Sequence, residues 1–425
     1  MLRFVQWLVS LQWPLRLFGF LFGGFNPWLE ETRRDPLPAY RRLRENEPIR
    51  RNRWQGSWLL SRYDDVAAVL RDPRFSTDRR GLLPFRMMRR ASRRHPDFVN
   101  LLDRNLLILD GEEHRRVRGL VSKAFTPRRI EALRPRVEAI VDELLDAVAA
   151  QGELELVHDL AHPLPVIVIA ELLGVKLADR ERFRGWSNDV VQVLDLLSGR
   201  EGLRPAWRGA QGLAEYFRAL LAERRRAQQD DLLSAMLAAE EEGRALGEAD
   251  LLSLCALLLA AGHETTTNLI GNAVLALLRH PGERKRLQDD LALMPGAVEE
   301  FLRFDAPVQV TDRVVSEDLD FRGLRFRRGQ LAVCLLGAAN HDPARFPDPE
   351  RLDVTRADRG HLAFGLGPHV CVGNHLTRMI GEVVLEETLD RFAPGALRLA
   401  PGYRWVCVAH LQEYGPETLD VVVAG

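Results

Sequence analysis

Apolar residues recur every three to four positions between residue 111 and about residue 305. This spacing predicts helices, because it gathers apolar side chains on one face of a 3.6-residue turn. The pattern is interrupted at Thr126-Pro127, Gly152, Gly174, Gly243 and His280-Pro281-Gly282. Proline and glycine at such places are typical of helix ends, so the region is expected to form several helices rather than one.

Shorter elements precede this region. Trp58-Leu59-Leu60 predicts a strand, and residues 63–71 predict a short helix that Asp72-Pro73 ends. Residues 78–105 contain Gly81, Pro84 and Pro96, and we expect them to form a long loop.

After Pro307 apolar residues alternate with polar ones over short distances, as around Phe321 and Phe326. Alternation of this kind predicts small antiparallel strands. Helical spacing returns at about residues 374–392 and is followed by further short strands. The sequence therefore predicts a fold that is mainly α with a minor β portion (α+β).

Residues 1–28 are apolar and rich in aromatic side chains, with Pro14 and Arg16 inside the run. A helix that spans a membrane needs about 20 mostly apolar residues, so a spanning helix is not expected here, nor is a secretory signal. Two interpretations stay open: an extension packed on the protein, or an interfacial segment in peripheral contact with a membrane. No repeat divides the remainder, so we expect an extension over 1–30 and one large domain over 31–425.

Composition narrows the function classes. The formal net charge of −1 over 425 residues provides no global attraction to nucleic acid. Four cysteines lie far apart with no paired spacing, which argues against a disulfide framework and fits a reducing cytoplasm.

Cys371 stands in a loop with a chemical pattern, from Phe364 to Gly373, that leads directly into a predicted helix. A thiolate at a helix N-terminus is stabilised by N–H donors and by the helix dipole. Glycines allow tight turns and the close approach of a flat cofactor. A buried structural cysteine, or a zinc site with His369 and His375, are the alternatives, but structural zinc normally takes two or more thiolates.

This segment resembles the cysteine-ligand loop of the cytochrome P450 family, Phe-Gly-x-Gly-x-His-x-Cys-x-Gly, and it matches every fixed position. The features described below follow in the family's order, so the resemblance covers roughly residues 36–425. It implies a soluble bacterial type of P450 fold holding heme b (iron protoporphyrin IX), with Cys371 as the iron ligand. The heme-binding residues of this loop would be Phe364, Gly365, His369, Cys371 and Gly373.

Residues 247–279 form a long apolar helical pattern that carries Ala261-Gly262-His263-Glu264-Thr265-Thr266. Taken alone, the glycine and threonines indicate only a kink. The family resemblance implies an acid–alcohol pair, with Glu264 as the relay acid and Thr265 as the hydroxyl at the oxygen. Ala261 and Gly262 would leave room for dioxygen, and proton delivery of this kind serves O–O cleavage.

Glu300 and Arg303 lie three residues apart in a predicted helix that ends before Pro307, which alone indicates an ordinary surface pair. The resemblance implies a buried Glu-x-x-Arg pair, joined by an arginine from Pro349-Glu350-Arg351-Leu352, so Arg351 is expected to complete it. It also implies that four side chains bind the heme propionates: His114 and Arg118 from one helix face, Arg313, and His369. A solvated face is the alternative for His114 and Arg118.

The resemblance implies a hydrophobic substrate, and the sequence offers apolar candidates for the pocket. These are Phe85, Met88, Leu257, Val308 and Val310, for which ordinary core packing is an equal alternative. The chain has no flavin or NAD fingerprint, so electrons are expected from a ferredoxin or flavodoxin with its NAD(P)H reductase. Arg115, Arg116 and Arg378 are candidate docking side chains for that partner.

The sequence predicts an oxygen-activating monooxygenase that hydroxylates or epoxidises an apolar small molecule. Two alternatives remain: a heme-thiolate protein with other chemistry, such as a peroxygenase or an isomerase, and a heme-binding sensor. The pair Glu264-Thr265 favours the monooxygenase, because the alternatives need no proton relay.

Overall fold

The computed structural model describes residues 30–52, 56–149, 153–191, 203–241, 247–392, 395–408 and 412–423. The apolar stretch over residues 1–28 lies outside them. The chain divides into two compact units. Unit 1 comprises residues 1–75, 133–164 and 265–425, and unit 2 comprises residues 76–132 and 165–264.

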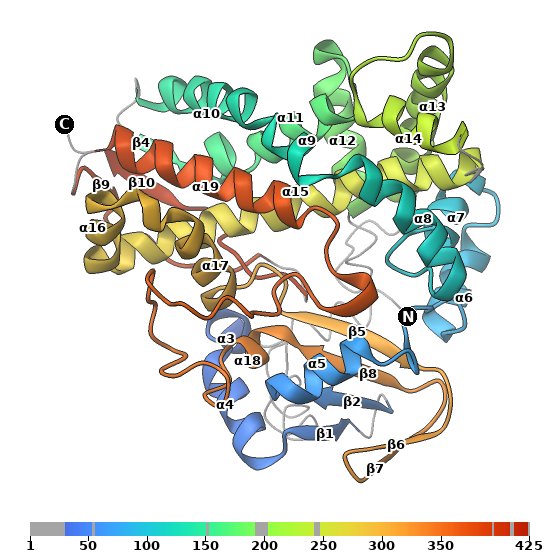
Figure 1. Cartoon of the computed structure of the whole chain (residues 1–425), viewed down its shortest axis with the longest axis horizontal. Coiled ribbons are helices and arrows are strands. Elements are labelled where there is room, and N and C mark those ends of the chain that lie inside the picture. Colours follow the sequence, from blue (N-terminus) through green and yellow to red (C-terminus); the bar gives the residue numbers. More distant parts are fainter. Residues whose placement is uncertain are drawn as a thin grey trace. The chain divides into compact units, whose positions relative to one another are not determined.

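Unit 1 combines helices with all the sheets. Its helices are α3 (Glu30–Arg34), α4 (Leu37–Asn46), α5 (Tyr63–Arg71), α10 (Arg134–Ala149), α16 (Pro281–Asp289), α17 (Met294–Phe304), α18 (Leu336–Asn340) and α19 (Asn374–Arg391). Short turns of other helix types are η1 (Val157–Ala161), η3 (Leu291–Leu293) and η4 (Gly367–His369). In Figure 1, α19 runs close to α10, against which it packs.

The main sheet of unit 1 has the strand order β1-β2-β8-β5-β3. Its strands are β1 (Ile49–Asn52), β2 (Ser57–Leu60), β3 (Phe75–Ser76), β5 (Val310–Val315) and β8 (Leu331–Leu335). Strand β8 pairs with β5 in antiparallel fashion, as predicted, but with β2 in parallel, with Trp58 opposite Ala332. The Trp58 ring stacks on Phe326 at 4.5 Å in the core below this sheet.

Two smaller sheets complete unit 1. One is the hairpin of β6 (Leu319–Phe321) and β7 (Leu324–Phe326), and the other joins β4 (Glu153–Glu155), β10 (Asp420–Val423) and β9 (Leu397–Leu399). Strand β4 lies in the region where helical spacing was expected to dominate, directly after the interruption predicted at Gly152. It is held because β10, far away in sequence, supplies its antiparallel partner.

Unit 2 is helical. It contains α6 (Leu83–Ala91), α7 (Pro96–Asp103), α8 (Gly111–Ala124), α9 (Pro127–Glu131), η2 (Leu177–Asp179), α12 (Arg180–Val191), α13 (Arg204–Arg226) and α14 (Leu232–Glu241). The long helix α13 packs against α7, α12 and α14. Helices α11 (Pro163–Leu172) and α15 (Glu248–Arg279) each continue from one unit into the other.

The prediction of a loop over residues 78–105 was wrong, because this stretch contains α6 and α7. Pro84 and Pro96, which suggested loop structure, instead stand in the first turns of these helices. Proline is favoured there, since its missing N–H would have no partner inside the helix. The strand at residues 58–60, the helix over 63–71 and the long helix near 247–279 were predicted correctly.

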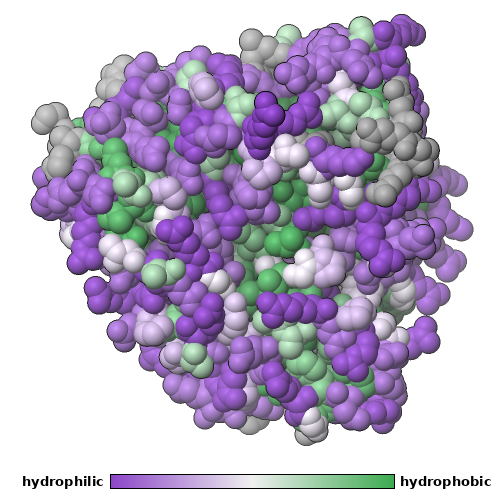
Figure 2. All heavy atoms as spheres, viewed as in Figure 1, coloured by the Kyte–Doolittle hydropathy of each residue, from purple (hydrophilic) through white to green (hydrophobic). Residues whose placement is uncertain are grey.

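The fold is mainly α with a minor β portion, as predicted. On the face drawn in Figure 2, hydrophilic side chains cover most of the surface, and hydrophobic ones show in scattered patches. None of the helices in the described ranges combines the length and apolar character that crossing a bilayer would require.

Candidate heme-thiolate site

Cys371 lies in unit 1, three residues before α19 begins at Asn374. Its backbone N–H donates to the carbonyl of Phe364 at 2.9 Å, which closes the loop around the turn η4. Its carbonyl accepts a hydrogen bond from Nδ2 of Asn374 at 2.6 Å. The loop is therefore tied at both sides of the cysteine, and the thiol is presented at the start of a helix.

Glycine stands at three positions of this loop for different structural reasons. Gly365 and Gly367 have φ angles of 69° and 77°, in the left-handed region that favours glycine. A Cβ on Gly367 would lie 2.6 Å from the carbonyl oxygen of Leu70, so this glycine lets the loop pack on α5. A Cβ on Gly373 would meet no atom within 4 Å. Gly373 thus leaves open space beside Cys371, which suits a flat cofactor bound through the sulfur.

A buried carboxylate behind the loop was missed in the sequence. Glu299 accepts hydrogen bonds from Arg378 at 2.5 and 3.2 Å and from Nε2 of His361 at 3.2 Å. Arg378 donates to Oδ1 of Asn374 at 2.7 Å, and Asn374 holds the Cys371 carbonyl. A continuous set of hydrogen bonds therefore joins α17 to the cysteine.

The guanidinium of Arg378 also lies 4.6 Å from the centre of the Phe364 ring, a cation–π contact that fixes the start of the loop. Arg378 was a candidate for docking a redox partner; its side chain is 31% exposed and ion-paired with Glu299, and its role in docking stays a prediction. Arg116 is likewise bound, to Asp250 at 2.9 Å. Arg115 remains exposed on α8.

Burial acts to raise the pKa of the Glu299 carboxyl, but the hydrogen bonds and charges of His361 and Arg378 outweigh it. They lower this pKa to about 2. Glu299 is therefore a carboxylate at neutral pH, and Arg378 keeps its ionic partner. The sequence gives no local signal for Glu299, because its partners His361 and Arg378 lie far away along the chain.

Glu300 and Arg303 form a buried ion pair on α17, with both side chains 1% exposed. Two hydrogen bonds of 2.7 and 2.8 Å join them in the fork geometry of arginine and a carboxylate. Arg303 also donates to the carbonyls of Asn340, Pro349 and Arg351 at 2.8 to 3.3 Å. The pair thus fastens α17 to the segment that precedes the cysteine loop.

The expectation that the Arg351 side chain completes this pair was wrong. Arg356 does so, donating from Nε to Oε2 of Glu300 at 3.1 Å. Arg351 contributes only its backbone carbonyl, and its side chain is exposed. The turn after Pro349 brings Arg356 back toward α17, and the spacing of residue types in the sequence does not show this reversal.

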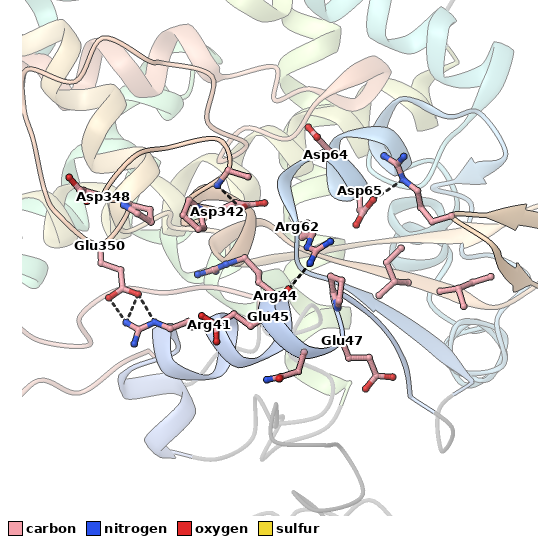
Figure 3. A pocket seen from close by; sticks show the side chains of 18 of the residues that line it. Arg41, Arg44, Glu45, Glu47, Arg62, Asp64, Asp65, Asp342, Asp348 and Glu350 are labelled. Atoms are coloured by element: carbon pink, nitrogen blue, oxygen red, sulfur yellow. Dashed lines mark hydrogen bonds and ion pairs between the residues drawn. The ribbon is translucent and has the colours of Figure 1, made fainter.

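The Arg351 side chain instead lines a cleft of about 1440 Å³ in unit 1, drawn in Figure 3. Its walls are charged and mostly paired, as where Arg41 meets Glu350 at 2.5 to 3.1 Å and Arg322 meets Asp65 at 2.9 Å. No other predicted site residue lines it.

Helix α15 is buried over most of its length, with an accessible strip in its middle. The strip includes Ala261, which is exposed, and Glu264 and Thr265, which are half-buried. These positions are three and four residues apart and share one helix face. The helix stays continuous through the threonines, so the kink suggested by the sequence does not interrupt it.

Gly262 has a packing role. A Cβ at this position would lie 2.6 Å from Cδ1 of Ile169 on α11. Gly262 therefore lets α15 pack closely against Ile169, and the expectation that Ala261 and Gly262 leave room for dioxygen stays a prediction.

His114 and Arg118 lie one turn apart on α8 in unit 2, as expected. Burial, and then the positive charge of Arg118, lower the pKa of the His114 imidazole. The two residues are four positions apart in one helix, so their side chains share a helix face. A lowered pKa favours the neutral imidazole, which donates through one ring nitrogen.

Arg313 and His369 both belong to unit 1. Arg313 is 5% exposed on β5, where it lies opposite Ala332 and donates to the carbonyl of Asp312 at 2.8 Å. His369 ends the turn η4, two residues before Cys371, and is half-buried. A buried guanidinium and a histidine beside the thiol are donors of the type that carboxylates require.

The apolar pocket candidates are divided between the units. Phe85, Met88 and Leu257 lie in unit 2, and Leu257 is buried in α15 whereas the other two are half-buried in α6. Val308 and Val310 lie in unit 1, both half-buried, and Val310 begins β5. Their contact with a substrate stays a prediction.

All four cysteines are free thiols in the structure, as the sequence predicted. The part of the chain that the structure describes contains no group of three His, Cys, Asp or Glu side chains placed to hold a metal ion, His369, Cys371 and His375 included.

The family model described as Cytochrome P450 matches residues 59–396 of the chain. Cytochrome P450 107B1 of Saccharopolyspora erythraea is 42% identical over 375 residues, covering 86% of this chain and 90% of that protein. Vitamin D(3) 25-hydroxylase of Pseudonocardia autotrophica is 40% identical over 356 residues, covering 83% and 85%.

A solved structure agrees with these relatives. P450BioI, in complex with an acyl carrier protein ligated to hexadec-9Z-enoic acid, is 36% identical with a TM-score of 0.85. The match covers 93% of this chain and 99% of that one. The fold and relatives define a heme-thiolate monooxygenase. The chain belongs to the cytochrome P450 family.

Proposed function

We propose that the chain inserts one atom of dioxygen into a hydrophobic small molecule by hydroxylation or epoxidation. The observation that carries this proposal is the strip in the middle of α15, where Ala261 is exposed and Glu264 and Thr265 are half-buried, whereas most of the helix is buried. A carboxyl and a hydroxyl on this accessible strip can exchange protons with water, which is what a proton relay requires.

The proposed cofactor is heme b, with Cys371 as its iron ligand and four propionate donors. These donors are His114, Arg118, Arg313 and His369. When bound, heme supplies the binding, reduction and splitting of dioxygen, and thiolate ligation favours the splitting. Phe364 shields the sulfur from water, while the open space at Gly373 admits the ring system.

The proton relay is assigned to Glu264 and Thr265. The carboxyl of Glu264 takes protons from water, and the hydroxyl of Thr265 passes them to the side of the helix where Ala261 leaves room. The two residues are adjacent in α15, so their side chains leave the helix about 100° apart, and the proton passes between them through water.

The substrate is proposed to be apolar, and the redox partner a ferredoxin or flavodoxin with its NAD(P)H reductase. Relatives support an apolar substrate class: one is named a vitamin D(3) 25-hydroxylase, and another was solved with a fatty-acyl carrier protein. Phe85, Met88, Leu257, Val308 and Val310 are the proposed apolar contacts. A screen of apolar ligands for shifts in the heme spectrum would identify the compound class.

Thr265→Ala tests the proposal, with Thr266→Ala as the matched control, since Thr266 is 2% exposed and lies off the accessible strip. In a system with ferredoxin and reductase, T265A should keep oxidising NADPH but yield at least about tenfold less product per NADPH, because general acid catalysis contributes about 10²–10⁴-fold. T266A should stay coupled. Unchanged coupling in T265A would contradict the relay, and peroxide-driven turnover alone would favour a peroxygenase.

A further inference from the structure

Helix α6 in unit 2 turns an unusual face to solvent. None of its nine residues is buried, although α6 is an ordered α-helix. Leu83 is 67% exposed and Met87 is 54% exposed, which places two of the most exposed large hydrophobic side chains of the described residues on one short helix.

The exposed face combines apolar and cationic side chains. Leu83, Arg86, Met87 and Arg90 are spaced i, i+3, i+4 and i+7, so they lie on one side of the helix. Phe85 and Met88, on another side, are half-buried. We call the four outward residues the α6 face.

Positive charge around the α6 face is largely uncompensated. Arg93 and Arg94, just after the helix, are exposed like Arg86 and Arg90, and within the described ranges these four guanidinium groups make no hydrogen bond or ion pair. In contrast, Arg89 bonds Asp103 at 3.0 Å.

The segment is held firmly at both ends, so its exposure is not that of a loose loop. Before the helix, Arg80 bonds Asp78 at 2.9 Å and Glu113 of α8 at 3.3 Å. After it, Ser92 is fully buried and accepts a hydrogen bond from Nε1 of Trp207 on α13 at 2.9 Å. The His95 ring stacks on the Trp207 ring at 4.0 Å.

We propose that the α6 face docks on the surface of an anionic lipid bilayer. Leu83 and Met87 enter the boundary between headgroups and acyl chains, while Arg86 and Arg90 reach lipid phosphates with their stems along the apolar layer. Arg93 and Arg94 add long-range attraction to negative lipid. An acidic protein would satisfy the arginines but not the apolar residues between them, so the bilayer fits the whole face better.

The test is binding of the full-length, heme-loaded protein to vesicles of phosphatidylcholine with or without phosphatidylglycerol. Each arginine at such a surface accounts for about fivefold in the partition coefficient, so Arg86→Gln with Arg90→Gln should weaken binding to anionic vesicles roughly 30-fold. Arg225→Gln with Arg226→Gln is the control, because these arginines are also exposed and end α13 in the same unit. It should stay within about twofold of the wild type, since it removes the same charge away from the α6 face.

The double variant Leu83→Ser, Met87→Ser tests insertion and should weaken binding to anionic vesicles at least about tenfold, because apolar burial is lost. Residues 1–28 are intact in every variant, so any contribution from them cancels. No binding by the wild type, or equal binding by the Arg86/Arg90 variant and its control, would overturn the proposal. The proposal would also be overturned if the Arg86/Arg90 variant bound anionic vesicles as the wild type does but lost binding to an immobilised acidic carrier protein. That result would assign the α6 face to a protein partner.

Discussion

Replacing Arg356 by methionine tests which arginine completes the buried Glu300–Arg303 pair. The Arg356 side chain is 11% exposed and makes four hydrogen bonds, to Glu300 at 3.1 Å and to the carbonyls of Pro347, Asp348 and Arg351 at 2.8 to 3.3 Å. The bond to the buried carboxylate is worth about 1.5–3 kcal/mol. The three carbonyls lie nearer the surface and can bind water in the variant. The loss of their hydrogen bonds to Arg356 therefore adds only about 1 kcal/mol.

R356M should therefore lower the free energy of unfolding by about 3 kcal/mol. This is near the low end of the 3–5 kcal/mol expected when a buried pair is broken, because Glu300 keeps Arg303. R351M is the matched control and should change the free energy by less than about 0.5 kcal/mol, since its side chain is exposed. Urea unfolding of the heme-loaded proteins, followed by circular dichroism, measures both. Equal destabilisation by the two variants would show that Arg356 does not complete the Glu300–Arg303 pair.

Three further variants probe the cysteine loop. E299Q removes a carboxylate whose pKa is lowered from 4.5 to about 2. In the wild type, this carboxylate stabilises the folded state fully above pH 4.5, and its contribution is lost as the pH falls toward 2. The wild type should exceed E299Q by on the order of 3 kcal/mol at pH 7, with a difference that shrinks below pH 4.5 in urea titrations. G367A should destabilise by at least about 2 kcal/mol, because its φ is 77° and its Cβ would meet the Leu70 carbonyl. G373A should leave the thermal unfolding midpoint of the heme-free chain unchanged but lower the amount of heme bound per chain. A fall in the midpoint together with the heme content would contradict the open space at Gly373.

The local elements near the cysteine were predictable because their signals are local. Helix α5 ends where Asp72-Pro73 predicted, and α19 begins directly after the loop around Cys371. The pair Glu300–Arg303 was also predictable, since an i, i+3 spacing within one helix fixes the contact.

Contacts that depend on a chain reversal were not predictable. Arg356 rather than Arg351 reaches Glu300 because the turn after Pro349 folds back, and no spacing rule encodes that path. The role of Glu299 depends on Arg378 and His361, which approach from two other segments. Proline misled the prediction for residues 78–105, since it begins helices as well as interrupting them.

Ligation of heme iron by Cys371 is the central claim, and the spectrum of the reduced, carbon monoxide-treated protein tests it most directly. The wild type should show the red-shifted Soret band of thiolate-ligated heme, and Cys371→Ser should lack it. Cys407→Ser, which changes a half-buried thiol elsewhere in unit 1, should keep the band. A wild-type spectrum without the shifted band, or a shifted band that survives in Cys371→Ser, would contradict the account.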